Sequence, residues 1–361
     1  MCPAHGSAGE AVLTVNAGST GVKLSVVYGD DHSEPVADLS APVPADLVAV
    51  GHRVVFGGSR FTAPVLIDDR VAHALAEHSA VAPLHNAPAL RLIGEARAAF
   101  PDTPHVAAFD TAFHATLPDE VVVYPVPESW MTEWDVRRHG FHGLSVEWAV
   151  GRAAALLRHS IDELRLVVCH LGGGASATAV RGGRSVDTSM GFSPLEGLVM
   201  ATRSGSLDPD IPLHLILHGG MAPKEVRRML NEESGLEGLT GTADMREVEA
   251  RATTGDERAR LALAVYDHRL AATVGAMAAS LGGLDALVFT GGVGERSARV
   301  RAEAARRLAF LGVAVDAARN AEPGEDADVS PAGASVRTLV VRSREEIVIA
   351  RAARRVAGGA A

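Results

Sequence analysis

Three glycine-rich segments, each directly after a run of apolar residues, are the first feature of the sequence that points to chemistry. They read NAGSTG (16–21), HLGGGAS (170–176) and TGGVGERS (290–297). Backbone N–H groups in such turns can converge on a phosphate, and glycine allows close approach of the ligand. None of them contains the Walker A pattern, and TGGVGERS is only a loose relative of GxGxxG. Together they make nucleotide phosphate and purely structural turns equally good interpretations.

Charged residues in apolar surroundings are the second feature. Arg53 lies in AVGHRVVFGG and Arg203 in VMATRSGSLDP. A guanidinium in such company needs a partner, and its fork suits a carboxylate or phosphate ligand, or equally an acid of the protein itself. Asp110 ends the apolar run HVAAF, where an acid either points into a cleft or caps the next element.

Several histidines are candidates for catalysis, and each is also explained as a structural histidine. His142 lies between Phe141 and a glycine in GFHGLS, and His170 precedes the second glycine segment. Neither GxSxG nor HExxH occurs, and Cys169 lies in a predicted strand. We therefore predict neither a serine or cysteine triad nor a transition metal held by the protein.

The composition limits the class of protein. With 361 residues, 47% of them hydrophobic, the chain can bury sizeable cores and favours two domains. Its net charge of -10 argues against binding to nucleic acid or to an anionic membrane surface. Two cysteines give no disulfide framework, so we expect a cytoplasmic protein, with neither a signal peptide nor a membrane segment.

The periodicity predicts the elements that must position these residues. A strand, a glycine-bearing turn and a second strand are predicted near the start of each half, at 12–27 and 164–186. Helices are predicted on either side of HNAP (85–88) and over 145–159, and another closes the chain after TLVVRS. The acidic stretch 320–333 is predicted to be a solvated loop. This weak duplication predicts two related α/β domains with a ligand cleft between them.

In order along the chain, the motifs resemble those of acetate kinases. They are VNAGSTGVK, GHRVVFGG, APLHNAP, FDTAFHATLP, GFHGLS, CHLGGGASATAV, DTSMGFSPLEGLVMATRSGSLDP, FTGGVGE and REEIVIAR, and the similarity runs from about residue 12 to 355. The resemblance implies the acetate and sugar kinase/Hsp70/actin fold, α/β with two duplicated actin-like (ribonuclease H-like) domains. It places one domain at 1–146, completed by a C-terminal helix at 344–361, and the other at 147–343.

The resemblance also implies phosphoryl transfer from ATP to acetate with Mg²⁺ or Mn²⁺, in a homodimer. The implied catalytic residues are Arg53, Asp110, His142 and Arg203, and the implied metal-associated residues are Asn16 and Glu345. An apolar pocket for the acetate methyl group maps to Val55, Leu84, Phe141 and Pro194. The implied nucleotide contacts are Ser19, Lys23, His170, Gly172, Gly173, Gly174, Asp244, Met245, Arg246, Gly292 and Gly294.

The chemistry fits these residue types. A carboxylate is already a nucleophile, so catalysis consists of pressing two anions together and stabilising the transferring group. Arg53 and Arg203 can neutralise acetate and phosphoryl oxygens, His142 can donate to the developing charge, and Asp110 can orient an arginine or the metal shell. We expect direct in-line transfer without a phosphoenzyme.

The chain also departs from the pattern of most family members at Gly21, Phe56, Gly173 and Arg296, and in FHGLSV at Leu144 and Val146. Three of these departures lie in the glycine segments, so the identity of the phosphoryl donor stays open, with pyrophosphate as the alternative. Propionate or another short-chain acid is the alternative acceptor, since an apolar pocket discriminates one methylene only modestly. A non-catalytic actin- or Hsp70-like nucleotide-binding module is the distant alternative.

Overall fold

The computed structural model describes residues 10–18, 21–78 and 83–359, without the side chains of residues 78 and 83–86. The chain forms two compact units. Unit 1 comprises Met1–Ala115, Phe141–Trp148 and Arg344–Ala361, and unit 2 comprises Thr116–Gly140 and Ala149–Ser343. Each unit is built around a six-stranded sheet.

The sheet of unit 1 has the order β3-β2-β1-β4-β6-β5. Its first two strands form an antiparallel hairpin, in which Gly18 pairs with Gly21, and β1, β4 and β6 run parallel to one another. The short strand β5 is antiparallel to β6. The strands are β1 Val12–Gly18, β2 Gly21–Val27, β3 Ser33–Val36, β4 Ala49–Val54, β5 Val65–Leu66 and β6 His105–Phe109, and the helices are α1 Asp69–His78, α2 Pro83–Ala99, η2 Ala112–Thr116 and α14 Glu345–Gly358.

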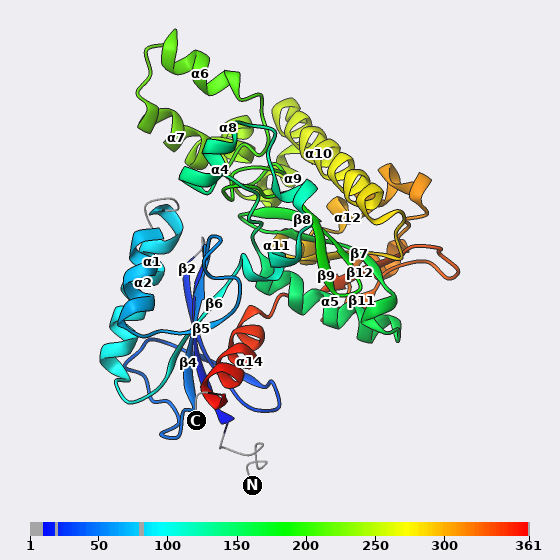
Figure 1. Cartoon of the computed structure of the whole chain (residues 1–361). Helices are drawn as coiled ribbons and strands as arrows, with labels where there is room; N and C mark the ends of the chain where they lie inside the picture. The colour runs from blue at the N-terminus through cyan, green and yellow to red at the C-terminus, as the bar shows by residue number, and fades with distance from the viewer. Residues whose placement is uncertain (1–9, 19–20, 79–82, 360–361) are drawn as a thin grey trace. The chain divides into compact units, whose positions relative to one another are not determined.

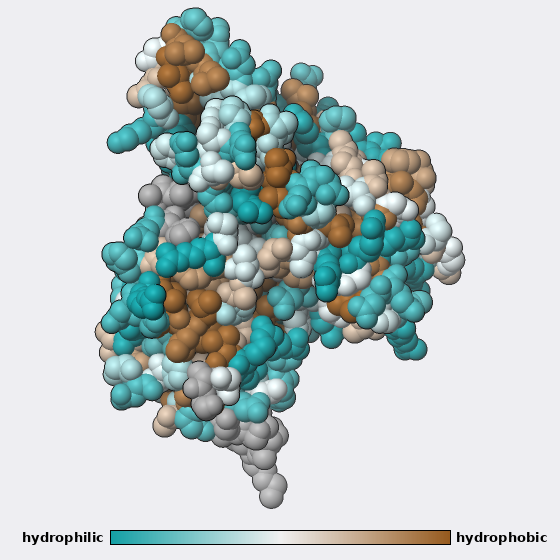
Figure 2. Space-filling view, in the orientation of Figure 1, coloured by the Kyte–Doolittle hydropathy of each residue, from teal (hydrophilic) through white to brown (hydrophobic). Residues whose placement is uncertain are grey.

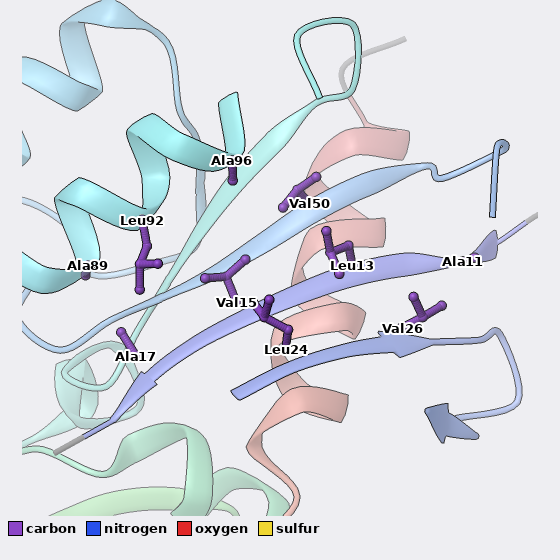
Figure 3. Close-up of a cluster of buried hydrophobic side chains, with 10 residues drawn as sticks. All are labelled: Ala11, Leu13, Val15, Ala17, Leu24, Val26, Val50, Ala89, Leu92 and Ala96. Carbon is purple, nitrogen blue, oxygen red and sulfur yellow. The ribbon is translucent and has the colours of Figure 1, made fainter. Parts of the chain in front are cut away.

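Helices cover both faces of this sheet. Side chains at alternate positions of a strand point to opposite faces. On one face Val50 packs with Leu92 of α2, in the cluster drawn in Figure 3. On the other face α14, red in Figure 1, packs on β1, β4 and β6, and a Cβ at Gly51 would come within 2.7 Å of Ile349. The end of the chain thus completes the unit that the beginning of the chain starts.

The sheet of unit 2 repeats the same connectivity. Its order is β11-β12-β10-β7-β8-β9, so the antiparallel strands β7, β8 and β9 correspond to β1, β2 and β3. Strands β10 and β12 continue it in parallel, and β11 is antiparallel at the edge, as β5 is in unit 1. The duplication predicted from the two glycine-bearing hairpins is therefore present at the level of the whole sheet.

The strands of unit 2 are β7 Arg165–Leu171, β8 Ala175–Arg181, β9 Arg184–Thr188, β10 Ala286–Thr290, β11 Asp326–Asp328 and β12 Arg337–Val341. Its helices are α3 Asp119–Val122, α4 Glu128–Trp134, α5 Gly143–Leu157 (which begins in unit 1), η3 Ile161–Glu163, α6 Asp210–Leu217, α7 Pro223–Glu232, α8 Gly235–Thr240, α9 Met245–Thr253, α10 Glu257–Leu281, α11 Gly291–Arg296, α12 Ala298–Arg307, η4 Ala309–Leu311 and α13 Ala317–Ala321. The long helix α10 packs on β8 and β9.

Two local predictions are wrong. HNAP lies inside α2, which begins at Pro83 and contains Pro88 in its second turn. The apolar face of α2 that packs on the sheet outweighs the hydrogen bond that Pro88 cannot donate. The acidic stretch 320–333 contains β11, which pairs with β12, and Asp328 of β11 also forms an ion pair with Arg337 of β12.

Among the residues that the structure describes, the helices are too short or too polar to cross a bilayer.

Candidate functional site

Arg53 is the centre of a buried polar cluster in unit 1. It lies near the end of β4, beside the ends of β1 and β6, because these three strands are parallel neighbours. Its Nε and Nη2 donate to the two oxygens of Asp110 at 2.9 and 2.6 Å. Its Nη1 donates to Asn16 Oδ1 at 3.1 Å and to Glu345 Oε2 at 3.0 Å. Strand ends and the first residue of α14 thus bring four predicted residues together.

The electrostatics of this cluster depend on burial. Burial opposes the charge of Arg53, but the carboxylates of Asp110 and Glu345 outweigh it and raise the arginine's pKa. Burial also opposes the charge of Asp110 and therefore raises its pKa, while the hydrogen bonds and charge of Arg53 act in the opposite direction. A guanidinium is charged throughout the accessible pH range, so the bidentate contact holds Asp110 as a carboxylate. One cation therefore faces two anions.

The segment 141–143 lies against this cluster in a strained conformation. His142 has φ +61°, which is uncommon outside glycine, and its backbone N–H donates to the Asp110 carboxylate. The N–H of Gly143 donates to the backbone oxygen of Asp110 at 2.9 Å. A Cβ at Gly143 would lie 2.2 Å from that oxygen, so this position requires glycine. Backbone strain held in this way is typical of functional sites.

His114 holds the same segment through its side chain. Its Nε2 lies 2.9 Å from the backbone oxygen of Phe141, and burial lowers its pKa to about 4. The ring is therefore neutral near pH 7 and its Nε2–H donates to Phe141. Phe141 in turn stacks on Phe56 with ring centroids 6.2 Å apart. The histidine of FDTAFH is thus a structural group that fixes the backbone next to His142.

The predicted apolar pocket residues divide between the units. Phe141 is buried and Val55, directly after β4, is half-buried, both in unit 1. Leu84 lies in α2, but its side chain is outside the described residues. Pro194 belongs to unit 2.

Two of the predicted nucleotide contacts lie at the first glycine segment. Ser19 is outside the described residues. Lys23 pairs with Asn16 across the β1–β2 hairpin, which places both side chains on one face.

Arg203 is a buried cation in unit 2. Its side chain donates from Nη1 to the backbone oxygen of Pro194 at 2.7 Å, and 7% of the residue is exposed. Burial lowers its pKa to about 10, and among the described residues no carboxylate counteracts that effect. A buried guanidinium without an anionic partner is costly, and a bound anion removes that cost. The geometry of Arg203 therefore suits an anionic ligand.

The second and third glycine segments meet at the ends of neighbouring strands. Thr290 pairs with His170 where β10 and β7 end. A Cβ at Gly172 would lie 3.6 Å from His170 Nε2 and 3.9 Å from the backbone nitrogen of Gly292. The third segment is helical, so its backbone N–H groups form the start of α11 rather than an open turn. Three predicted phosphate contacts thus lie together in unit 2.

The second glycine segment is hydrogen-bonded to the segment that carries Arg203, and the predicted adenosine contacts lie at the start of α9. The N–H of Ala201, two residues before Arg203, donates to Gly173 O at 3.2 Å. Asp244 caps α9 by accepting from the N–H of Arg246, and it also pairs with the Arg246 side chain. Met245, between them, is buried.

Arg296 is a residue to which the sequence assigns no role. Its Nη2 would lie 2.6 Å from a Cβ at Gly292, so its guanidinium covers this glycine. Its charge also helps to lower the pKa of Asp244, after the hydrogen bonds from Arg246. The signal in the sequence is that Arg296 is one of the departures from the pattern that the resemblance implies. Gly294 is buried against Phe289 of β10 and Cys169 of β7.

The oxygen donors around Arg53 fit a hard cation. Asn16, Asp110 and Glu345 supply amide and carboxylate oxygens, the ligand type that Mg²⁺ prefers, and Mg²⁺ commonly uses one or two carboxylates together with phosphate and water. Among the described residues there is no cluster of three or more acidic, histidine or cysteine ligands. A cation here therefore needs oxygens from a phosphate ligand as well.

Comparisons with known proteins agree with this arrangement. The model of the acetokinase family matches residues 37–351. The acetate kinase of Clavibacter michiganensis subsp. michiganensis is 51% identical over 305 residues, 84% of this chain and 77% of that protein. A crystal structure of a propionate kinase from Francisella tularensis subsp. tularensis has TM-score 0.88 and 34% identity over 96% of this chain and 100% of its own. That of Porphyromonas gingivalis acetate kinase has TM-score 0.85 and 31% identity over 96% and 99%. The predicted α/β class with two duplicated actin-like domains is confirmed.

Proposed function

The chain belongs to the acetokinase family, whose enzymes are phosphotransferases with a carboxyl group as acceptor and ATP as a substrate, and we propose that it transfers the γ-phosphoryl group of ATP to acetate. The products are acetyl phosphate and ADP. The observation that carries this proposal is Arg203, a buried guanidinium that no carboxylate of the described chain neutralises. An incoming acetate supplies the missing negative charge.

In this proposal the acetate methyl group lies among Val55, Leu84, Phe141 and Pro194, and its carboxylate lies against Arg203. One carboxylate oxygen attacks the γ-phosphorus in line while the bond to the β-phosphate oxygen breaks, so no covalent enzyme intermediate forms. Arg203 reduces the repulsion between the two anions. The acceptor needs no general base, because it is already ionised at neutral pH.

The cluster around Arg53 acts on the phosphoryl group. Asp110 holds the Arg53 fork in one orientation, so that the cation is available without losing entropy at the moment of transfer. His142 donates a hydrogen bond to the charge that develops on the transferring oxygens. Asn16 and Glu345 would hold Mg²⁺ together with phosphate oxygens, and the ion would neutralise charge on the phosphates when bound.

The donor nucleotide contacts the remaining predicted residues in this proposal. Its phosphates bind at the glycine segments and its adenosine at the α9 region. The proposed contacts are Ser19, Lys23, His170, Gly172, Gly173, Gly174, Asp244, Met245, Arg246, Gly292 and Gly294.

The assembly we propose is a cytoplasmic homodimer. Helix α6 exposes three large aliphatic side chains, and Figure 2 shows an apolar surface over it. These side chains are Ile211, Leu213 and Leu217. Exposed apolar faces of this kind commonly mark contacts between subunits. Sedimentation velocity of the purified chain measures whether it dimerises.

The test is a matrix of donors against acceptors. ATP, GTP and pyrophosphate are each combined with acetate, propionate and butyrate, and acyl phosphate is trapped as the hydroxamate with and without Mg²⁺. We expect the highest kcat/KM for ATP with acetate, and slower turnover of propionate. Product with pyrophosphate and not with ATP overturns the choice of donor. Tight ATP binding without turnover of any acid would indicate a nucleotide-binding module.

Arg203→Met is the variant that checks the carrying observation. It should abolish turnover, whereas the melting temperature should change by no more than about 2 °C, because the variant also removes a buried charge. Arg301→Met is the matched control. Arg301 is also buried, but it donates to Asn320 Oδ1 and to the backbone oxygens of Gly294, Glu295 and Asn320. Its loss should clearly lower the melting temperature.

A further inference from the structure

The loop that carries Pro194, residues 189–197, is held by a polar cluster that the proposed mechanism does not use. Glu196 lies in this loop and accepts hydrogen bonds through both of its oxygens. The Tyr124 hydroxyl donates to Oε2, and Arg138 Nη2 donates to Oε1 at 2.9 Å. The same hydroxyl accepts from the N–H of Phe192 at 3.0 Å. Both partners come from the segment 116–140, which belongs to unit 2 together with the loop.

Arg138 adds a second set of contacts to the same loop. Its guanidinium lies 5.3 Å from the centroid of the Tyr124 ring. Its Nη1 donates to the backbone oxygens of Thr188 and Ser189 at 3.1 and 3.5 Å. Burial raises the pKa of the Tyr124 phenol, although Arg138 opposes this, so the phenol stays protonated and donates. The cluster therefore contacts the loop at its start and at Glu196.

Gly191 shows how closely this cluster is packed on the loop. A Cβ at Gly191 would lie 1.8 Å from Glu196 Oε2 and 1.9 Å from the Tyr124 hydroxyl oxygen. Only glycine leaves room for the contact between these two groups. The backbone oxygen of Gly191 also accepts from the N–H of His139 at 3.1 Å. Side chain and backbone thus fix the loop to the segment 116–140.

The loop in turn fixes Arg203. Pro194 O, two residues before Glu196, accepts the hydrogen bond from Arg203 Nη1 at 2.7 Å. The Arg203 guanidinium is buried and has no carboxylate partner among the described residues, so this carbonyl sets its direction. A shift of the loop therefore turns the cation that receives the carboxylate substrate.

We propose that Glu196, clamped by Tyr124 and Arg138, is a positioning residue for the acceptor, which acts through Pro194 and Arg203. The inference rests on the proposed role of Arg203 toward acetate. The glycine segments of unit 2 are placed mainly by the strands that they follow, β7 and β10, and their hydrogen bond with the N–H of Ala201 lies outside the loop 189–197. Loss of the clamp should hence weaken acceptor binding selectively.

The test compares Glu196→Gln and Tyr124→Phe with the parent chain. We expect the KM for acetate to rise about tenfold in Glu196→Gln and less in Tyr124→Phe, with the KM for ATP within twofold, because lost hydrogen bonds to a charged group allow small displacements. The double variant should be little worse than Glu196→Gln, since both remove the same contact. Propionate should be discriminated less well in both.

Glu303→Gln is the matched control. Glu303 also accepts hydrogen bonds from two arginines, Arg306 and Arg307, but both of these partners lie on its own helix α12 and not on the loop. It should leave both KM values unchanged. An acetate KM in Glu196→Gln equal to that of the control overturns the proposal, and so does a parallel change in both KM values.

Hydrogen exchange separates this inference from the proposed function. In Glu196→Gln, amides of residues 189–206 should exchange faster than in the parent, while the rest of unit 2 is unchanged. If the parent turns over no acetate, the proposed function fails, and faster exchange confined to 189–206 still supports the clamp. Unchanged exchange in this segment overturns it.

Discussion

Arg53 and Asp110 form a bidentate ion pair in the interior of unit 1, with Nε–Oδ1 and Nη2–Oδ2 distances of 2.9 and 2.6 Å. The pair is almost fully buried, with 10% and 1% of the two side chains exposed. Arg53 also forms an ion pair with Glu345, so it keeps an anionic partner when the charge of Asp110 is removed. Because asparagine has nearly the same shape as aspartate, Asp110→Asn tests the charge and the fixed direction of the Arg53 fork.

Asp110→Asn should reduce kcat by about 10²–10³-fold, because the fork of Arg53 loses its fixed direction. It should also lower the free energy of unfolding by about 3 kcal/mol, since one charge of a buried pair is removed. Hydroxamate assays and urea titrations measure the two quantities.

Asp285→Asn is the control for this variant. Asp285 accepts from Arg165 Nε and Nη2 at 3.1 and 2.7 Å in the same bidentate manner, but the two side chains are 31% and 39% exposed. Its loss should cost no more than about 1 kcal/mol and leave kcat unchanged. Equal activity losses in the two variants would refute a specific role for Asp110.

The buried histidine pair of unit 1 should make stability depend on pH. His52 Nε2 lies 2.9 Å from His105 Nδ1, and burial, with a smaller contribution from His105, lowers the pKa of His52 to about 3. His105 Nε2 lies 3.1 Å from Phe100 O, so the neutral pair donates from His52 to His105 and on to the backbone.

The direction of the effect follows from proton uptake. An unfolded His52 binds a proton below its ordinary pKa of 6.5, whereas the folded residue does not until about pH 3. Stability is therefore lost as the pH falls from 6.5 toward 3, by about 1.4 kcal/mol per pH unit for each such histidine. His52→Phe removes the uptake of about one proton on unfolding. The slope of the free energy of unfolding against pH should therefore fall by about 1.4 kcal/mol per pH unit between pH 6 and 4.5.

Urea titrations at several pH values measure the slope. His73→Gln is the control, because the side chain of His73 is 79% exposed and solvent reaches it in both states. A slope in His52→Phe equal to that of the parent would show that His52 takes up its proton without unfolding.

Gly21 offers a test of the first glycine segment. The resemblance to acetate kinases implies a serine here, but Gly21 has φ +135°, a conformation that costs other residues about 1–3 kcal/mol. Apart from its neighbours in the chain, no described residue lies within 4 Å of a Cβ built at this position. Gly21→Ser and Gly21→Ala should therefore lose similar stability.

The difference between these two variants isolates the hydroxyl group. If a hydroxyl at this position contacts the donor phosphate, the KM for ATP should be about threefold lower in Gly21→Ser than in Gly21→Ala. Identical KM values would make the departure from the family pattern neutral for donor binding.

The sequence by itself determined the local elements and the types of the site residues. Continuous apolar runs predict β1, β4, β6, β7 and β10, because a strand buried on both faces needs an apolar side chain at nearly every position. The acid after β6 and the glycines after β7 can be recognised because each directly follows such an apolar run. The domain boundary at residue 146, the cleft and the role of each site residue stay predictions.

Only the tertiary structure decided which residues meet. Asn16 and Glu345 are 329 positions apart, and they touch because α14 returns to the sheet that β1 begins. HNAP is helical because α2 packs on that sheet, although its local signals indicate a break. Arg53 has protein acids as partners and Arg203 has a carbonyl, a difference that their equally apolar sequence surroundings do not contain. Partners of a buried charge depend on long-range packing, which local sequence does not encode.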